Sequence, residues 1–182
     1  LAINPEQIRK DLAFFGQFGK KGVGYYVAEL KESIGTILGL DHHWNVAIIG
    51  MGHLGAALAN YQGIARLGFR LAAIFDANPI VIGTRVGERR VEDIAYLAEI
   101  IAERDIRIGV IAVPAAAAQE VADKLVAAGI RGIWNFAPVN IQVPPTIPFV
   151  SEDLSVGLSS LSYYLSHAVP EETELSDKNS HD

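Results

Sequence analysis

The chain has 182 residues, half of them hydrophobic, and a formal net charge of −6 at pH 7. This length suits one domain with an appendage, and no apolar run reaches the roughly 20 residues that a membrane-spanning helix needs. The sequence has no cysteine, which excludes disulfides, thiolate catalysis and cysteine-ligated zinc. The net negative charge, taken alone, argues against a nucleic-acid-binding protein.

The charges are distributed unevenly along the chain. Residues 1–27 carry four basic and two acidic side chains, a net charge of +2, whereas residues 171–182 carry five acidic and one basic, a net charge of −4. The acidic segment has almost no apolar residues, so we predict a disordered tail over 169–182. The chain starts at Leu1 without methionine, and we expect its first domain to begin upstream of that residue.

Two helices are expected before the main domain. Asn4 is a suitable N-cap, Pro5 suits the first helical position, and Gln7 at the third position can reach back to the cap. Together they predict a helix that ends at Gly16. Periodic apolar residues predict a second helix over 27–38, followed by a short linker.

Polar side chains of the first helix and of the loop after it can contact nucleic acid. In the major groove, Gln7 can pair with adenine, and Arg9 or Lys10 with guanine. Lys20 and Lys21 lie between glycines, in a segment typical of a tight hairpin, and can reach phosphates or the minor groove. Composition alone nevertheless favours an ordinary solvated helix face.

The most informative segment is a glycine loop. Four apolar residues, 46–49, predict a buried strand, and Gly-x-Gly-x-x-Gly over 50–55 then turns the chain into a helix. Gly50 permits the tight turn, Gly52 lets backbone approach a pyrophosphate, and Gly55 lets helix and strand pack closely. The helix N-terminus offers N–H groups and a partial positive charge to phosphates.

An acidic residue stands where a ribose-binding carboxylate is expected. Asp76 ends the second apolar strand, 71–75, and lies 21 residues after Gly55. There its carboxylate can accept the ribose hydroxyls of NAD and repel the 2′-phosphate of NADP. The pattern predicts an NAD(H) site. The alternatives are a strand–helix turn that merely needs glycines, or a site for CoA or a mononucleotide.

From residue 46 onward, strands and helices alternate. In order, we predict a strand over 46–49, a helix over 53–67, a strand over 71–75, a loop over 78–90, a helix over 91–104, a strand over 108–113, a helix over 115–128, strands over 130–135 and 149–150, and a helix over 152–167 capped by Ser151. Repeated βα units imply an α/β fold of Rossmann type, with a parallel sheet and helices on both faces.

Cofactors bind at the carboxyl ends of such parallel strands, which here face one crevice. The candidate cofactor-binding residues in that crevice are Gly50, Met51, Gly52, His53, Leu54, Gly55, Asp76, Val113 and Pro114.

The last helix, which follows a proline-rich arm, is apolar on more than one face. Its large side chains are Leu154, Val156, Leu158, Leu161, Tyr163, Tyr164 and Leu165. A helix that is apolar on more than one face needs more packing partners than one sheet edge supplies. It is either exchanged or shared at the interface of a homodimer, or it packs on its own domain.

No catalytic or metal-binding residue is predicted beside the cofactor. No tyrosine is followed four residues later by lysine, and no histidine has an obvious acid partner. We interpret the histidines as surface residues: His42, His43, His53, His167 and His181. The chain is thus expected to bind NAD(H) without turning it over, as a sensor does. The alternative is a CoA- or NAD-binding domain of an acyl-CoA ligase-like or dehydrogenase-like enzyme.

Three parts of the chain coincide with the pattern of one known family. Residues 7–25 look like the recognition helix and wing of the redox-sensing transcriptional repressor Rex family, and residues 48–58 resemble its NAD loop. Residues 134–139, 153–158 and 161–165 resemble its carboxyl half.

The resemblance implies a bacterial, cytoplasmic homodimer that binds a palindromic operator as a repressor and is released by NADH. The DNA-binding residues would be Gln7, Arg9, Lys10, Lys20 and Lys21. An exchanged C-terminal helix would bring Asp153 into an inter-subunit network tied to redox state. The expected domains are a partial winged helix over 1–39, a Rossmann NAD(H)-binding domain over 40–150, a dimerisation helix over 151–168 and the acidic tail over 169–182.

Overall fold

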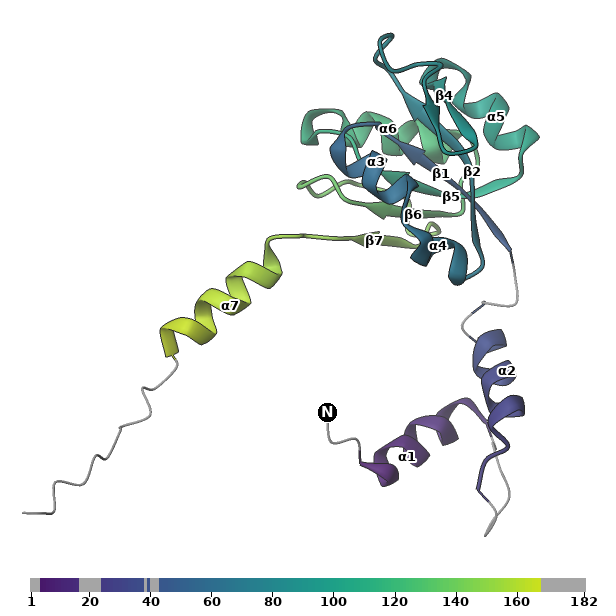
Figure 1. Ribbon diagram of the computed structural model, residues 1–182, viewed down its shortest axis with the longest axis vertical. Coiled ribbons are helices and arrows are strands. Elements are labelled where there is room, and N and C mark those ends of the chain that lie inside the picture. Colours follow the sequence, from purple (N-terminus) through teal and green to yellow (C-terminus); the bar gives the residue numbers. More distant parts are fainter. Residues whose placement is uncertain (1–3, 17–23, 38, 40–42, 168–182) are drawn as a thin grey trace, which may run out of the picture.

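The computed structural model describes residues 4–16, 24–37, 39 and 43–167. Its centre is a seven-stranded sheet in the order β3-β4-β2-β1-β5-β6-β7, with helices on both faces (Figure 1). Neighbouring strands are parallel, except that β3 and β4 form an antiparallel hairpin. The α/β fold of Rossmann type that the sequence predicts is confirmed.

The strands in chain order are β1 (Trp44–Ile49), β2 (Phe69–Asp76), β3 (Arg85–Val86), β4 (Arg89–Asp93), β5 (Ile106–Ile111), β6 (Gly132–Asn135) and β7 (Phe149–Ser151). The three central strands, β1, β2 and β5, are almost wholly apolar, and their inner residues are buried. Strands that are buried on both faces read as continuous apolar runs, which is why the sequence locates them.

The helices in chain order are α1 (Pro5–Phe15), α2 (Val27–Ile37), α3 (His53–Ala59), α4 (Gln62–Arg66), α5 (Leu97–Glu103), α6 (Ala115–Ala127) and α7 (Val156–His167), with one 3₁₀ turn, η1 (Ile94–Tyr96). Side chains of α5 and α6 pack on one face of the sheet in the larger apolar core. Side chains of α3 pack on the other face in a smaller core with residues of β1, β2 and β5. The described residues include no helix that is both long and apolar enough to cross a membrane.

The single helix predicted over 53–67 is wrong, because the chain forms α3 and α4 with a break between them. Asn60 ends α3, and its side-chain amide donates to the carbonyl of Ala56 at 2.8 Å. The ring of Tyr61 folds against Gly63, where a Cβ would overlap it. An asparagine that bonds to the preceding turn ends a helix, and the glycine makes room for the ring.

The helix predicted to begin at residue 91 is also wrong, since residues 89–93 form strand β4. Main-chain pairing with β2 aligns Val91 with Ile74 and Asp93 with Asp76. The carboxylate of Asp93 then accepts the N–H of Ala95 at 2.8 Å and caps the 3₁₀ turn that leads into α5. The apolar periodicity of α5 continues by chance into the strand, so it gives the wrong boundary.

The last helix begins later than predicted, and Ser151 is not its cap. Ser151 is the final residue of β7 and pairs with Asn135 of β6. The carboxylate of Asp153 instead accepts from Ser155, at 2.8 Å from the backbone N–H and 2.6 Å from the hydroxyl, just before α7. Helix α7 leads away from the sheet at the end of β7 (Figure 1), and none of its residues is buried.

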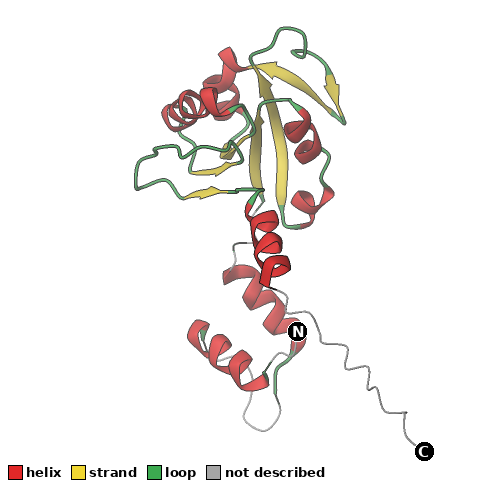
Figure 2. Ribbon diagram, turned by 90° about the vertical axis from the view of Figure 1, so that its left-hand side faces the viewer, coloured by secondary structure: helices red, strands yellow, loops and turns green. Residues whose placement is uncertain are grey.

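The first helix, α1, starts as expected but without the predicted contribution of Gln7. Asn4 accepts the N–H of Glu6 at 2.9 Å, and Pro5 is the first helical residue. The Gln7 side chain points along the helix and donates to Asp11 at 2.8 Å, so it does not reach back to the cap. Helices α1 and α2 lie outside the body built on the sheet (Figure 2).

Candidate functional site

The glycine loop joins β1 to α3 at the carboxyl edge of the central strands. Its start is held between two neighbours, because the N–H of Gly50 donates to the carbonyl of Phe75 in β2 at 2.8 Å. On the other side, the N–H of Ala112 after β5 donates to Ile49 at 2.8 Å. These two hydrogen bonds therefore fix the position of the loop between β2 and β5 at the edge of the sheet.

Two of the three glycines are required by the fold itself. Gly50 has φ +101°, a left-handed value, and a Cβ there would lie 2.6 Å from the carbonyl oxygen of Ala112. A Cβ on Gly55, which is buried in α3, would overlap the carbonyl oxygen of Gly50. The roles predicted for these two residues, a tight turn and close packing, agree with this geometry.

The middle glycine is different, because nothing in the protein requires it. Gly52 has φ −73° and ψ −170°, which any residue adopts, and a Cβ there would have no atom of the described residues within 4 Å. Gly52 lines the cleft beside the loop, so the free space next to its backbone is space that a ligand can use. This is the relation that a pyrophosphate-binding loop needs.

Asp76 lies at the end of β2, where the sequence places it, and both of its carboxylate oxygens accept backbone N–H groups. Oδ2 accepts from Met51 at 2.6 Å, and Oδ1 accepts from Asn78 at 2.7 Å. The first bond ties the second strand to the glycine loop. Since each carboxylate oxygen has more than one lone pair, both can still accept a ribose hydroxyl.

A cleft of about 390 Å³ opens beside the loop and has the size of a cofactor site. Six of the nine predicted cofactor-binding residues line it: Gly50, Met51, Gly52, Asp76, Val113 and Pro114. The other three begin α3 without lining the cleft, and there His53 is exposed, Leu54 is half-buried and Gly55 is buried. The described residues contain no cluster of side chains suited to holding a metal ion.

The cleft has a second wall that sequence reasoning missed. One stripe of α6 faces it through Ala117, Glu120, Val121 and Lys124, at the spacing i, i+3, i+4, i+7. This helical spacing was visible in the sequence, but it resembles any helix face that packs on a sheet. The facing wall, after β2, includes Asn78, Val81 and Ile94, whose place depended on the unpredicted strand β4.

Glu120 and Lys124, which both line this cleft, form an ion pair. The Lys124 Nζ lies 2.7 Å from Glu120 Oε1. The hydrogen bond and the positive charge of Lys124 lower the pKa of the Glu120 carboxyl, so this carboxylate is charged at neutral pH. Glu120 and Lys124 therefore add two opposite charges to a wall that Ala117 and Val121 otherwise make apolar.

The candidate DNA-binding residues of α1 are exposed. Arg9 Nε donates to the carbonyl of Pro5 at 3.3 Å, and Lys10 Nζ lies 3.7 Å from the carboxylate of Glu6. Such bonds between exposed side chains one helical turn apart are weak, so both cations can exchange them for other partners. Lys20 and Lys21 lie outside the described residues, as does the tail over 169–182.

A second surface, which we call the apolar groove, lies on the sheet face beside α4. It encloses about 450 Å³ and is lined mainly by carbon from α4 and from strands β1, β2, β5, β6 and β7, with Ile64, Leu67, Trp134 and Val150 among its residues. Contiguous exposed apolar surface is common at interaction sites. In the same chain, α7 exposes seven large apolar side chains in and before the helix: Leu154, Val156, Leu158, Leu161, Tyr163, Tyr164 and Leu165.

The fold and the glycine-loop cleft define a dinucleotide-binding protein of the Rossmann class. Among curated proteins, the redox-sensing transcriptional repressor Rex of Chloroflexus aurantiacus is 47% identical, covering 90% of this chain and 77% of the relative. The Rex repressor of Clostridium perfringens is 46% identical, covering 92% of this chain and 79% of the relative. Residues 41–139 match the family model described as "CoA binding domain".

Solved structures agree with the sequence relatives. The crystal structure of RSP with beta-NAD⁺ and operator DNA matches with a TM-score of 0.86 and 42% identity, covering 91% of this chain and 76% of that chain. RSP with beta-NADH matches with a TM-score of 0.81 and 40% identity, covering 91% of this chain and 77% of that chain. A further crystal structure of RSP, a Rex-family repressor, matches with a TM-score of 0.82 and 41% identity, covering 91% of this chain and 77% of that chain. The chain belongs to the Rex family of redox-sensing transcriptional repressors.

Proposed function

We propose that this chain is a repressor that binds operator DNA as a homodimer and leaves it when NADH occupies the cleft beside the glycine loop. The observation that carries this function is Gly52, whose glycine identity nothing in the protein requires but a bound pyrophosphate would. The relatives support the two ligands, since RSP is described with NAD⁺ and operator DNA and separately with NADH.

The cofactor would be held by the residues that line the cleft. Gly50, Met51 and Gly52 would lie against the pyrophosphate, and the N-terminal turn of α3, from His53 to Gly55, would supply backbone N–H groups. Asp76 would accept the ribose hydroxyls. Val113 and Pro114 would form the far wall.

The nicotinamide would be bound without being turned over. Neither the cleft nor the glycine loop presents a tyrosine–lysine pair or a histidine with an acid partner among the described residues. The relatives carry the name of a repressor, not of an enzyme. We therefore propose a sensor with no catalytic residue, which works beside DNA in the cytoplasm.

The two ligands would be coupled by a shift between two dimer arrangements. A 100-fold effect of NADH on DNA affinity needs about 2.7 kcal/mol of coupling, or half of that at each of two sites. Asp153, which precedes α7, would take part in the inter-subunit contacts that differ between the two states. Its hydrogen bonds with Ser155 lower the pKa of the Asp153 carboxyl, so it would bring a negative charge to that interface.

The dimer would form by exchange of α7, which would lie in the apolar groove of the partner subunit. The helix and the groove have complementary chemistry, since seven large apolar side chains in and before α7 are exposed and the groove is lined mainly by carbon. Burial contributes roughly 1.5–3 kcal/mol for each large apolar side chain. Several such side chains could hold a dimer at nanomolar concentration even after the entropy of association.

We propose that the domains predicted from the sequence divide these roles as follows. Residues 1–39 would contact DNA through Gln7, Arg9, Lys10, Lys20 and Lys21, and residues 40–150 would bind NAD(H). Residues 151–168 would hold the dimer together, and residues 169–182 would form an acidic tail without a role in either contact.

A titration with three ligands tests the function against its strongest alternative. Residues 41–139 match a family described as CoA binding, so CoA is a candidate ligand of the same cleft. Isothermal titration with NADH, NADPH and CoA should give saturable binding that is tightest for NADH, with no consumption of the cofactor. Preferred binding of CoA, or no binding of NADH, would refute the proposed sensor.

A further inference from the structure

We propose that the side chain of Asn135 couples the cofactor cleft to helix α7, because it holds the end of β7 in a position that depends on what fills the cleft. Asn135 is the last residue of β6, at the carboxyl end of the parallel strands. Within the part of the chain that the structure describes, it is the one polar side chain whose exposed fraction is 0%. This inference rests on the proposed function, since it concerns the route between the two ligands.

The buried amide of Asn135 finds its hydrogen-bond partners on two different segments. Its Oδ1 accepts the N–H of Ala137 at 3.0 Å, and its Nδ2 donates to the carbonyls of Ala137 and Val139, each at 3.1 Å. These bonds shape the turn over 136–139, which we call the β6 turn. Nδ2 also donates to the Ser151 hydroxyl at 3.1 Å, at the end of the strand that leads to α7. Asn135 therefore joins the β6 turn to the end of β7.

The amide nitrogen of Asn135 has more acceptors than hydrogens. An –NH₂ group carries two hydrogens, whereas three oxygens lie at the same distance of 3.1 Å from Nδ2. At least one hydrogen is therefore shared between two acceptors in a three-centre bond. A shared hydrogen moves toward one acceptor when the other moves away, so a small shift of the β6 turn changes how strongly the amide holds Ser151.

The β6 turn is attached to the wall of the cofactor cleft. The N–H of Phe136 donates to the carbonyl of Ile111 at 2.9 Å. The two residues after Ile111, which are Ala112 and Val113, line the cleft, and Val113 packs against the same apolar core as Ala137. Close-packed neighbours transmit small displacements. A cofactor that presses on Ala112 and Val113 would therefore shift the β6 turn as well.

On its other side, Asn135 controls the segment from which α7 starts. The N–H of Glu152 donates to the main-chain carbonyl of Asn135 at 2.8 Å. Asp153 follows directly, and its carboxylate accepts from Ser155 just before α7. Two bonds of Asn135 thus fix the end of β7, and of these the side-chain bond to Ser151 is the one that competes with the β6 turn. The position of Ser151 in turn sets the direction in which α7 leaves the sheet.

Ser151→Ala tests this coupling, because it removes the hydroxyl acceptor and leaves the amide its two carbonyl partners. Ser151 is exposed, so the fold should tolerate the change. Ser151→Thr keeps the hydroxyl on a residue type that strands favour, and it should behave as the parent. Thr146→Ala is the matched control, since it removes an exposed hydroxyl of the arm before β7 that takes no part in the bonds of Asn135.

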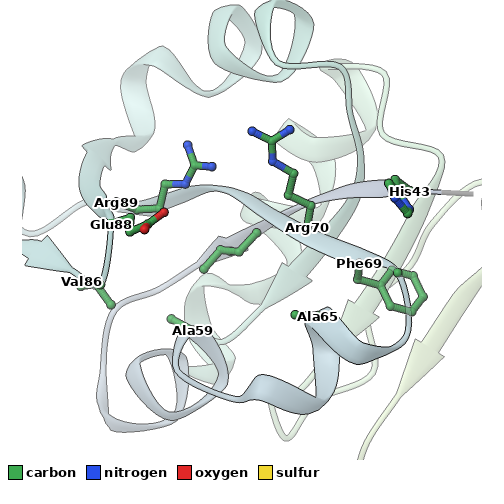
Figure 3. A pocket seen from close by; sticks show the side chains of 11 residues that line it. His43, Ala59, Ala65, Phe69, Arg70, Val86, Glu88 and Arg89 are labelled. Atoms are coloured by element: carbon green, nitrogen blue, oxygen red, sulfur yellow. The ribbon is translucent and has the colours of Figure 1, made fainter.

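Arg70→Gln is a second control, at the opposite end of the strands. Arg70 is exposed near the start of β2 and extends its guanidinium group to the side of that strand away from Ala59 and Ala65 (Figure 3). It does not line the cofactor cleft. An effect of surface charge on DNA binding would appear in this variant as an equal change with and without NADH.

Two measurements on the full chain test the coupling. Hydrogen–deuterium exchange of residues 149–155, with and without saturating NADH, follows the N–H of Glu152. NADH should change this exchange rate about threefold or more in the parent, in Ser151→Thr and in both controls, and Ser151→Ala should lose most of that difference. Fluorescence anisotropy with a palindromic operator duplex gives the factor by which NADH weakens DNA binding. Ser151→Ala should lower that factor about two- to tenfold, as the loss of one hydrogen bond predicts.

The outcomes separate this inference from the proposed function. Parental responses of Ser151→Ala in both measurements would overturn the coupling and leave the sensor standing. So would a parent in which bound NADH does not change the exchange of residues 149–155, or an equal loss in Thr146→Ala. Faster exchange of Ser151→Ala by the same factor with and without NADH would also overturn it, since a merely structural role predicts that result. A parent whose operator affinity NADH does not change, but whose exchange responds and loses the response in Ser151→Ala, would refute the sensor and support the coupling.

Discussion

Replacing Gly52 with alanine separates ligand binding from folding, because the three glycines of the loop have different reasons to be glycine. A methyl group on Gly52 would meet no protein atom within 4 Å, whereas one on Gly55 would overlap the carbonyl oxygen of Gly50. Gly52→Ala should therefore leave the fold intact and impair NADH binding. Gly55→Ala, the matched control, should destabilise the fold itself.

The magnitudes follow from these contacts. At Gly52, the weaker N-cap propensity of alanine costs about 0.5–1 kcal/mol, and the lower entropy of the unfolded chain returns a similar amount. The melting temperature should thus change by no more than about 2 °C. Overpacking at Gly55 costs about 1–3 kcal/mol, which lowers the melting temperature of a chain of this length by about 3–10 °C.

For NADH, a methyl group on Gly52 keeps the pyrophosphate from the backbone. Loss of one hydrogen bond to a charged group, about 1.5–3 kcal/mol, weakens binding roughly 10- to 100-fold. Calorimetric titration with NADH and thermal melting of both variants measure the two effects on the same samples. A Gly52→Ala protein with the parental NADH affinity would refute the assignment of this loop to the pyrophosphate.

Asp76→Ala should cost about 1.5–3 kcal/mol of NADH affinity and narrow the preference over NADPH, and unchanged titrations with both cofactors would remove Asp76 as the ribose ligand. Lys21→Ala should weaken operator and non-operator DNA alike and lower the slope of log K against log salt by about one, whereas a loss confined to the operator would mean that Lys21 reads bases. Deleting residues 151–182 should give monomers or aggregates with weaker NADH binding, whereas deleting residues 171–182 should change neither the dimer nor the NADH affinity. Light scattering of both truncated proteins measures the oligomeric state. An intact dimer without residues 151–182 would exclude α7 from the interface.

Patterns that depend on one local cause were readable in the sequence. The apolar run of β1, the glycine spacing and the position of Asp76 follow from burial on both faces and from the geometry of one turn. Six of the nine expected cofactor residues line the cleft for this reason. Strands β5 and β6 and helix α6 were located because each is bounded by residues that stop or start an element.

Features set by strand pairing, or by where one side chain lies, were not readable in the sequence. Strand β4 contains four charged residues in five and is a strand because it pairs with β2. The break between α3 and α4 depends on how the ring of Tyr61 lies over Gly63. The α6 wall belongs to the site because η1 and the loop after β2 lie opposite it across the cleft. For β4 and for the α6 wall, the deciding contacts join residues far apart in the sequence, whereas the break after α3 depends on where one ring lies, which apolar periodicity does not record.

The central claim is that NADH and operator DNA oppose each other on this chain, and one measurement tests it directly. A palindromic duplex selected from a random pool with the NAD⁺-bound protein would be titrated by fluorescence anisotropy at fixed salt, with and without saturating NADH. The account predicts that NADH weakens DNA binding by a large factor, on the order of 100-fold, and that Gly52→Ala loses this response while retaining DNA binding. An operator affinity that NADH leaves unchanged would contradict it.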